Sequence, residues 1–364
     1  MRFLSCFLIA AVMALPALAD APALRQYVCH KTAKAPKLDG KLDDAVWKNV
    51  HWTADFADIE GAGKPVPRFR THAKMLWDDQ ALYIAAELEE PQVWATLTQR
   101  DVVVYADNDF EIFIDPNGDN FEYAELELNA FGTPWDLLLP MPYKDGGRPM
   151  EAWNLVKTRI AIAIQGTINN PKDTDKGWTI EIAIPWSDLA IPTQARGAPK
   201  DGDLWKMNFS RVEWQVEVKD GKIVKVPGKP EDNWVWSPTG ILDIHRPEAW
   251  GTVQFSSTAP GAPVAIRADP LAEARTVLHQ IYYAQREFYA KNNRWAKDLA
   301  ELGLALPPAK TIVAGPTIKI VDPHWKEWKG WLATAEVAMP DGTRKQVRIR
   351  HDSWFTIDEK AMEK

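Results

Sequence analysis

The chain has 364 residues, of which 46% are hydrophobic and 26% charged, a balance typical of globular domains and unlike that of disordered or collagen-like chains. At about 150 residues per domain, this length indicates two or three domains. The net charge of −7, with no cluster of Lys and Arg to neutralise phosphates, argues against nucleic acid as a partner.

Residues 1–19 predict a cleaved secretory signal peptide. Arg2 precedes an apolar run from Phe3 to Leu15, and small residues follow at Ala17 and Ala19. We therefore expect cleavage near Ala19/Asp20 and a secreted or periplasmic mature chain. No later stretch reaches the roughly 18 apolar residues of a membrane-spanning helix, so we expect no transmembrane anchor in the mature chain.

Residues 20–256 predict a mainly β domain. Short runs of alternating apolar residues are separated by Gly, Pro, Asn and Asp, which is typical of antiparallel strands joined by turns. The runs lie at 81–88, 109–115, 123–130, 158–164, 178–184 and 204–214. We predict an antiparallel β-sandwich of the jelly-roll or immunoglobulin-like kind.

Residues 257–268 are rich in Pro and small residues and predict a linker to a small α+β domain at 269–364. Asp269 and Pro270 are suited to begin a long amphipathic helix, which we expect to end at Asn292–Asn293. A short second helix should stop at Gly303, and a hairpin should turn at residues 340–342. This tail is weakly similar to the globular part of type IV pilin-like proteins, and its protein partner stays unknown.

Several kinds of chemistry lack a motif in this sequence. No two of the seven His residues have the i, i+4 spacing of a helical zinc site, and Cys29 is the single cysteine after the signal peptide. A disulfide framework is therefore excluded. We find no nucleophile elbow, Walker loop or dinucleotide fingerprint.

The segment from Asp115 to Asn120 allows two interpretations. Asp115, Asn117 and Asp119 place oxygen ligands at alternate positions, as calcium loops do, so a Ca²⁺ site is one hypothesis. However, Leu126 stands where such loops carry a Glu. The same Asp, Asn and Gly residues are also typical of a hairpin turn.

Five blocks, in order, resemble a family 9 carbohydrate-binding module of the DOMON-like superfamily over about residues 37–256. They are LDGKLDDAVW (38–47), WDDQALYIAAEL (77–88), DNDFEIFIDP (107–116), GWTIEIAIPWSDL (177–189), and DLWKMNFSRVEW (203–214) with its continuation to residue 255. The resemblance implies a β-sandwich and an exported, non-catalytic protein that binds a saccharide and supports carbohydrate catabolism. The 18 Trp residues are then mostly core residues of the strands.

In this family a sugar lies between two aromatic faces and bonds to charged and amide side chains. The resemblance places Tyr105 at one aromatic platform, where the family has Trp, and Glu111 at a polar ligand. Two positions depart from the pattern, because Glu127 stands at the arginine position and Ser210 at the amide position. The second platform falls near His245, where Trp is missing, so Trp236 or His245 is expected to replace it.

From these positions and their neighbours we predict a ligand-binding pocket. Its candidate residues are Tyr105, Glu111, Glu127, Asn129, Trp135, Asp136, Arg211, Glu213, Trp236 and His245. Arg211 and Glu213 alternate on one strand face, so both can point into one cavity, although an outward ion-paired face explains them equally well.

Two other functions stay open. Haem-binding relatives within the superfamily use Met and His or Lys ligands. If this chain were a haem electron-transfer protein, its candidate ligands would be Met75, Met207 and His245. A glycoside hydrolase would need two carboxylates, for which Glu111, Glu125, Glu127 and Glu213 are the candidates.

Overall fold

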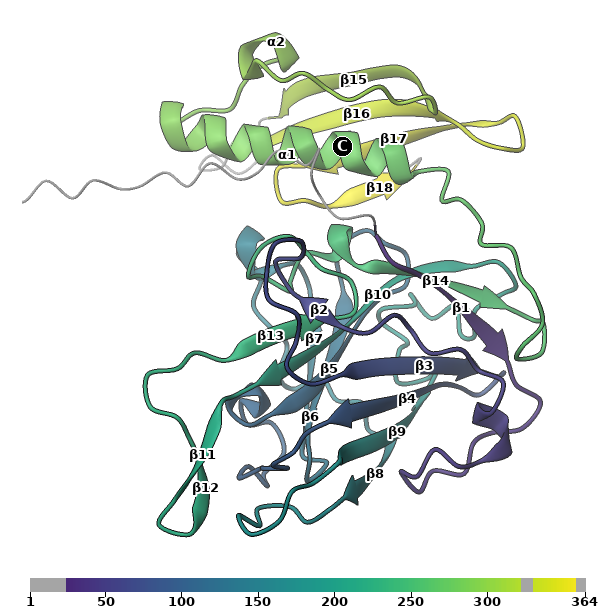
Figure 1. Cartoon of the computed structure of the whole chain (residues 1–364). Coiled ribbons are helices and arrows are strands. Elements are labelled where there is room, and N and C mark those ends of the chain that lie inside the picture. The colour runs from purple at the N-terminus through teal and green to yellow at the C-terminus, as the bar shows by residue number, and fades with distance from the viewer. Residues whose placement is uncertain (1–23, 322–329, 358–364) are drawn as a thin grey trace, which may run out of the picture.

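The computed structural model describes residues 24–321 and 330–357 (Figure 1). The predicted signal peptide at 1–19 lies outside the described residues. Within them, no helix is long and apolar enough to cross a membrane.

Most of the chain forms one large curled sheet. Its strands are β1 (Gln26–Lys31), β2 (Ala57–Asp58), β3 (Thr71–Trp77), β4 (Ala81–Glu89), β5 (Asp109–Asp115), β6 (Tyr123–Asn129), β7 (Pro134–Leu139), β8 (Arg159–Gln165), β9 (Gly177–Pro185), β10 (Leu204–Glu213), β13 (Asp232–Val235) and β14 (Gly251–Ser256). The order across the sheet is β7-β6-β5-β10-β14-β1-β3-β4-β9-β8, and β13 pairs with β10 and with β2. A separate hairpin of β11 (Val216–Lys219) and β12 (Lys222–Lys225) projects from it (Figure 1).

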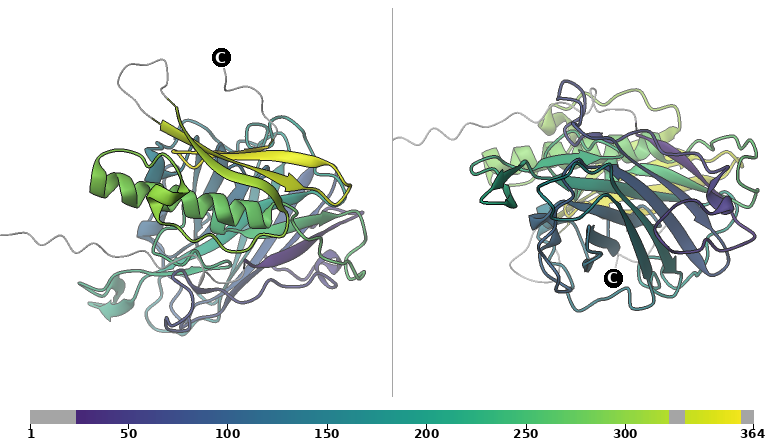
Figure 2. Two further views of the ribbon diagram at one scale, coloured as in Figure 1. Left: turned by 90° about the horizontal axis from the view of Figure 1, so that it is seen from above. Right: turned by 60° about the horizontal axis from the view of Figure 1, so that its bottom comes forward.

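The sheet curls so that its two halves face each other, as the two views of Figure 2 show. β1 pairs in parallel with both β14 and β3 and so joins the halves, whereas the other described pairings are antiparallel. The prediction of a mainly β, antiparallel sandwich is confirmed, with β1 as a parallel link between its two layers.

The core lies between the two halves, where strand alternation brings the apolar side chains together. Ile112 and Ile114 of β5 belong to the same buried cluster as Ile180 and Ile182 of β9. The opposite face of β5 and β6 carries Asp and Glu side chains that are also buried. This second face is where the candidate site lies.

Within residues 24–321 and 330–357, four 3₁₀ turns link the strands: η2 (Ala45–Trp47), η3 (Val104–Ala106), η4 (Tyr143–Asp145) and η5 (Pro247–Ala249). The segment before η2 is held on the sheet by Glu181 of β9. The Glu181 carboxylate accepts hydrogen bonds from the backbone N–H groups of Asp39 and Gly40, at 3.0 and 2.8 Å, and from Trp47 Nε1 at 2.7 Å. Trp47 therefore has a structural role.

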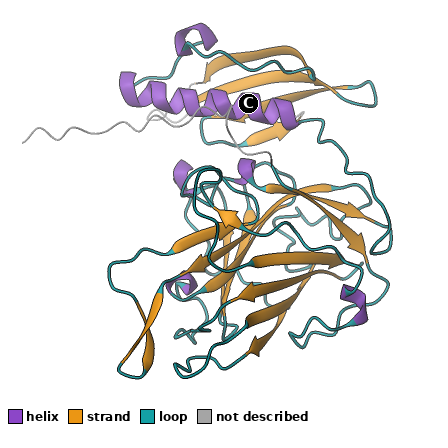
Figure 3. Cartoon of the chain, viewed as in Figure 1, coloured by secondary structure: helices purple, strands orange, loops and turns teal. Residues whose placement is uncertain are grey.

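The C-terminal part is an α+β unit, as predicted, with the long helix α1 (Ala272–Asn292) and the short helix α2 (Leu299–Leu302) (Figure 3). Asn293 ends α1 and Gly303 ends α2, both in the left-handed conformation. Its sheet has four strands, two more than the hairpin that the sequence predicts. They are β15 (Ile312–Val321), β16 (Gly330–Ala338), β17 (Arg344–Arg350) and β18 (Phe355–Ile357).

This α+β unit packs on the sandwich through η4 and the turn between β5 and β6. Asp145 of η4 accepts hydrogen bonds from Tyr282 and from Ser353 Oγ (2.7 Å), and it pairs with Arg286 at 3.0 Å. In the β5–β6 turn, Asn120 Nδ2 donates to the carbonyl oxygen of Ser353 at 2.8 Å. The turn η4 is therefore fixed from the side of the C-terminal unit.

Candidate functional site

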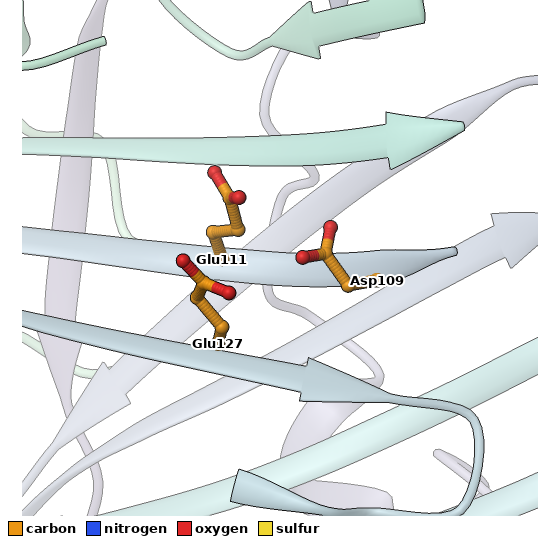
Figure 4. A group of neighbouring side chains, drawn as sticks. All are labelled: Asp109, Glu111 and Glu127. Atoms are coloured by element: carbon orange, nitrogen blue, oxygen red, sulfur yellow. The ribbon is translucent and has the colours of Figure 1, made fainter. Parts of the chain in front are cut away.

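Carboxyl groups gather on the outer face of β5 and β6. Glu111 is directly opposite Glu127 in the antiparallel register, and Asp109 is opposite Asn129 at the end of the same pair. Side chains opposite each other share a face, so Asp109, Glu111 and Glu127 point to one side of the sheet. One carboxylate oxygen from each lies within 4.8 Å of the others (Figure 4).

Burial makes ionisation of these groups unfavourable. Asp109, Glu111 and Glu127 are 0%, 5% and 2% exposed, and Glu125 beside them is 4% exposed. Burial raises the pKa of Glu111 to about 7 and, with the nearby Glu111 carboxyl, that of Glu125 to about 8. Burial and then Glu111 hold the pKa values of Asp109 and Glu127 well above their ordinary range.

Among the described residues, none of these four carboxyl groups forms an ion pair with Lys or Arg. Arg211 acts on Asp109 electrostatically, but its guanidinium is bound to Glu213 at 2.8 Å. Asp109 accepts a hydrogen bond from Val212 N at 2.9 Å, and Glu127 accepts one from Tyr105 N at 3.1 Å. The cluster is therefore a concentration of acidic groups without a basic partner of its own.

Exposed aromatic rings flank the acidic cluster on one side. Tyr105 of η3 is 43% exposed, and its ring centre is 6.1 Å from that of Trp135. Trp135 of β7 is directly opposite Glu127 and is partly exposed. Trp214 Nε1 donates to the carbonyl oxygen of Tyr105 at 2.8 Å and fixes the backbone of η3. Tyr105 and Trp135 thus lie next to the carboxyl groups, as the sequence predicts.

Tyr143 of η4, which sequence reasoning missed, is a second exposed ring. It is 41% exposed, and its pKa is raised first by burial and then by Glu125 and Glu127, with Tyr105 also contributing. Tyr143 therefore belongs to the same electrostatic environment as Tyr105. It lies in a loop outside the family-like blocks, and an aromatic residue between Pro142 and the Gly146-Gly147 pair was the available signal.

The ring of His245 packs against the exposed ring of Tyr143. The two rings meet edge to face with their centres 4.5 Å apart, and His245 Nδ1 is 2.9 Å from the hydroxyl of Tyr123. Phe113 also meets the imidazole nearly perpendicularly, with the ring centres 5.7 Å apart. Burial and Lys144 lower the pKa of His245 to about 3, so the ring is neutral. The structure thus gives His245 a supporting position and leaves the exposed position to Tyr143.

Arg211 and Glu213 share a strand face, as predicted, but it is the opposite face of the sheet. Ser210 is the residue directly opposite Glu111, so its neighbour Arg211 points toward the core. Arg211 Nη1 donates to Thr71 Oγ1 and to the carbonyl oxygen of Glu89, both at 2.9 Å. Arg211 and Glu213 are 0% and 2% exposed and form a buried ion pair away from the acidic cluster.

The side chains of three further predicted site residues are held by contacts within the protein. Trp236 is 1% exposed and packs on Phe209 in the core. Asp136 is on the core face, where its carboxylate accepts hydrogen bonds from Leu155 N and from Arg100. Asn129 shares the face of Glu127, but its Nδ2 donates to the carbonyl oxygen of Leu97 and to Asp107, and its Oδ1 accepts from backbone N–H groups of the following loop.

The side-chain oxygens of Asp115, Asn117 and Asp119 in the β5–β6 turn accept hydrogen bonds from protein donors. Asp115 accepts hydrogen bonds from the backbone N–H groups of Gly118 and Asn120, at 2.8 and 2.9 Å. Asp119 accepts them from the Asn117 side chain and from Trp354 Nε1 of the C-terminal unit. These contacts match the hairpin-turn interpretation of the segment and give Asp119 a role in domain packing.

The candidate haem ligands do not come together, whereas three of the four candidate carboxyl groups of a glycoside hydrolase do. Met75 and Met207 are fully buried in the core between the sheet halves, whereas His245 packs on Phe113 at the outer face. Glu111, Glu125 and Glu127 converge, but Glu213 lies on the other side of the sheet. The haem ligand set is thus divided by the sheet.

Two hollows lie away from the acidic cluster. One, of about 540 Å³, is lined by residues of the η2 segment together with Trp52 and Lys74. The other, of about 320 Å³, is lined by Phe131 and by isoleucines that include Ile160 and Ile162 of β8. Neither includes the carboxyl groups of β5 and β6.

Comparison with known proteins gives one family match. Residues 38–199 match the model described as "Carbohydrate family 9 binding domain-like". This range contains Tyr105, Glu111, Glu127 and Tyr143, whereas Arg211 and His245 lie beyond it.

Two curated proteins match over less than half of the chain. An exoglucanase, XynX, from Acetivibrio thermocellus is 26% identical over 156 residues, which is 43% of this chain and 12% of that protein. An endo-1,4-beta-xylanase C from Paenibacillus barcinonensis is 26% identical over 155 residues, 42% of this chain and 12% of that protein. The chain thus spans about an eighth of the length of these relatives.

Among solved structures, a family 9 carbohydrate-binding module from Caldicellulosiruptor kristjanssonii in complex with cellotriose aligns with 17% identity and a TM-score of 0.43. The alignment covers 67% of this chain and 100% of that one. On the family match, the segment at 38–199 belongs to the family 9 carbohydrate-binding domains.

Proposed function

We propose that this protein binds a saccharide on the outer face of β5, β6 and β7, between the rings of Tyr105 and Tyr143 and above the carboxyl groups of Glu111 and Glu127. The observation that carries the proposal is the exposed Tyr105 beside buried carboxyl groups, together with a second exposed ring, Tyr143, whose pKa burial and those carboxyl groups raise, within the segment that matches a carbohydrate-binding family. The remainder of the proposal follows from the chemistry of a pyranose.

A pyranose ring has an apolar C–H face and an edge of hydroxyl groups. The C–H face packs on aromatic rings, and the hydroxyls require polar partners. Tyr105 and Tyr143, at 43% and 41% exposed, offer ring faces to such a ligand. Carboxyl oxygens of Glu111 and Glu127 are suited to accept hydrogen bonds from its hydroxyls.

The ligand class follows from the relatives. The matched proteins are an exoglucanase and an endo-1,4-beta-xylanase, and the aligned structure holds cellotriose. We therefore propose gluco- or xylo-oligosaccharides as the ligands. In this proposal the chain is non-catalytic, is exported through residues 1–19, and acts in carbohydrate catabolism.

A glycan array with the chain at residues 20–364 tests the proposal. We expect saturable binding to gluco- or xylo-oligosaccharides, lost in Tyr105→Ala and kept in Tyr289→Ala, a matched control because Tyr289 of α1 is 41% exposed. No binding to any glycan by the folded wild type would contradict it. If incubation with the bound glycan produced new reducing ends, the protein would be a glycoside hydrolase and the non-catalytic proposal would be wrong.

A further inference from the structure

The carboxyl cluster on β5 and β6 has the geometry of a cation site. One oxygen each from Asp109, Glu111 and Glu127 lies within 4.8 Å of the other two. Ca²⁺ binds oxygen at about 2.3–2.6 Å, so two oxygens on one ion are at most about 5 Å apart. The three carboxyl groups are thus close enough to contact a single ion.

A second observation is independent of this spacing. Asp109 Oδ2 and Glu125 Oε2 are fully buried and accept no hydrogen bond from an N–H or hydroxyl donor, and the contacts of these two carboxyl groups with Glu111 and Glu127 lie within the cluster itself. Glu125 contacts Glu127 and interacts with Glu111, so its unpartnered oxygen belongs to the same cluster. A buried oxygen without a donor costs about 1–3 kcal/mol, and more when it is charged.

Some other buried carboxyl groups of this chain have basic partners, and others, such as Glu181 and Asp115, accept hydrogen bonds from N–H donors. Glu248 pairs with Lys144 and with Arg246, at 3.1 and 3.2 Å, and Glu213 pairs with Arg211. Among the described residues, the four groups at 109, 111, 125 and 127 form no such pair. Unlike Glu248 and Glu213, these four groups have no basic side chain to balance a negative charge, and a bound cation would supply that partner.

Burial limits the size of a ligand that can reach these carboxyl groups. Asp109, Glu111 and Glu127 are 0%, 5% and 2% exposed, so little of these side chains is accessible from the surface. A pyranose ring or an amino sugar is too large to contact all three carboxyl groups at that depth, whereas a bare ion is small enough. Carboxylate oxygens without His or Cys favour a hard cation such as Ca²⁺.

We propose that Asp109, Glu111 and Glu127, with Glu125 beside them, bind one Ca²⁺ ion, and that saccharide hydroxyls complete its coordination from the side of Tyr105 and Tyr143. Three carboxylates supply at most six oxygens, and Ca²⁺ takes six to eight. The second part rests on the proposed function. The first part is a property of the chain without any saccharide.

Cation binding is tested on chelator-treated residues 20–364 with Tb³⁺ luminescence and with calorimetric titration of Ca²⁺. Trp135 is directly opposite Glu127, so excitation of tryptophan should sensitise bound Tb³⁺, and Ca²⁺ should displace it. We expect one ion per chain, saturating below about 1 mM Ca²⁺. Trp135→Phe should reduce the luminescence and leave the calorimetric stoichiometry at one.

Isosteric variants locate the ion. Asp109→Asn and Glu127→Gln should weaken Ca²⁺ binding at least about tenfold, which is about 1.4 kcal/mol. Glu217→Gln on exposed β11 and Asp119→Asn in the β5–β6 turn should leave it unchanged. The wild-type titration needs no variant, so failure of the wild type to bind Ca²⁺ or Tb³⁺ would overturn the proposal, as would binding that survives both cluster variants.

A last titration separates the cation from the saccharide. With Ca²⁺ present, the oligosaccharide found on the array should bind at least about tenfold tighter than with the ion chelated. Equal affinity in both conditions, with Ca²⁺ bound, would overturn the coordination of the saccharide and leave the ion site standing. A chain that binds Ca²⁺ and no saccharide would overturn the proposed function alone.

Discussion

Glu111 of β5 and Glu127 of β6 stand directly opposite each other, both at least 95% buried, and neither has a Lys or Arg partner among the described residues. Burial raises the pKa of both carboxyl groups, and ionising both would place like charges opposite each other across an antiparallel pair, which is destabilising. The packing of the sandwich does not require this pair. In our proposals, both carboxyl groups bind the ligands.

Arg211→Ala should destabilise the fold and leave the saccharide affinity of the folded protein unchanged. The change removes the partner of Glu213 and leaves that carboxylate buried without a charge partner, which costs about 3–5 kcal/mol. Urea unfolding measures the loss, and calorimetry at low temperature measures the affinity. A loss of affinity without a loss of stability would place Arg211 in the binding site.

Gly40→Ala should destabilise the sandwich more than Gly228→Ala. Both glycines have positive φ, of +80° and +73°, so both changes introduce backbone strain of about 1 kcal/mol or more. A Cβ at Gly40 would also lie 2.5 Å from the carbonyl carbon of Ile162, whereas a Cβ at Gly228 has no atom within 4 Å. Equal midpoints in thermal unfolding would contradict the close approach at Gly40.

Stability should rise between pH 8 and 10 in the wild type relative to Lys206→Met. Burial lowers the pKa of Lys206 to about 8, against about 10.4 in an unfolded chain. In that window the unfolded chain holds more protons than the folded one, so the free energy of unfolding increases with pH. The relative gain should reach about 2–3 kcal/mol. Parallel pH profiles of the two proteins would show that Lys206 has an ordinary pKa.

Asp145→Ala should lower both the stability of domain packing and the saccharide affinity. The Asp145 side chain is fully buried, and it bonds to Tyr282, Arg286 and Ser353 of the C-terminal unit. Its loss should loosen η4 and with it Tyr143, at a cost of about threefold or more in affinity. Glu336→Ala, on the exposed side of β16, is the control. Unchanged affinity in Asp145→Ala would separate the C-terminal unit from the site.

The sequence could predict the face shared by Glu111 and Glu127, because alternation within β5 and β6 and a short turn between them define the local register. It could not show that Ser210 rather than Arg211 is opposite Glu111. β10 follows β5 by almost one hundred residues, so their register depends on the packing of the whole sandwich. The predicted pocket was therefore divided between the two faces of the sheet.

The position of Tyr143 shows a second limit of prediction from the sequence. A loop residue carries no periodic signal, and its position depends on contacts of η4 with Asp145 and the C-terminal unit, which is distant in sequence. The ends of α1 and α2, in contrast, follow from local residues, because Asn293 and Gly303 adopt the left-handed conformation that ends a helix.

The most direct test of the central claim is calorimetric titration of cellotriose into the wild type, Tyr143→Ala and Tyr289→Ala. If the saccharide lies between Tyr105 and Tyr143, Tyr143→Ala should weaken binding about tenfold, or about 1.4 kcal/mol, with Tyr289→Ala equal to the wild type. Wild-type affinity in a folded Tyr143→Ala would contradict the claim and exclude the outer face of β5–β7 beside Tyr143 as the binding surface.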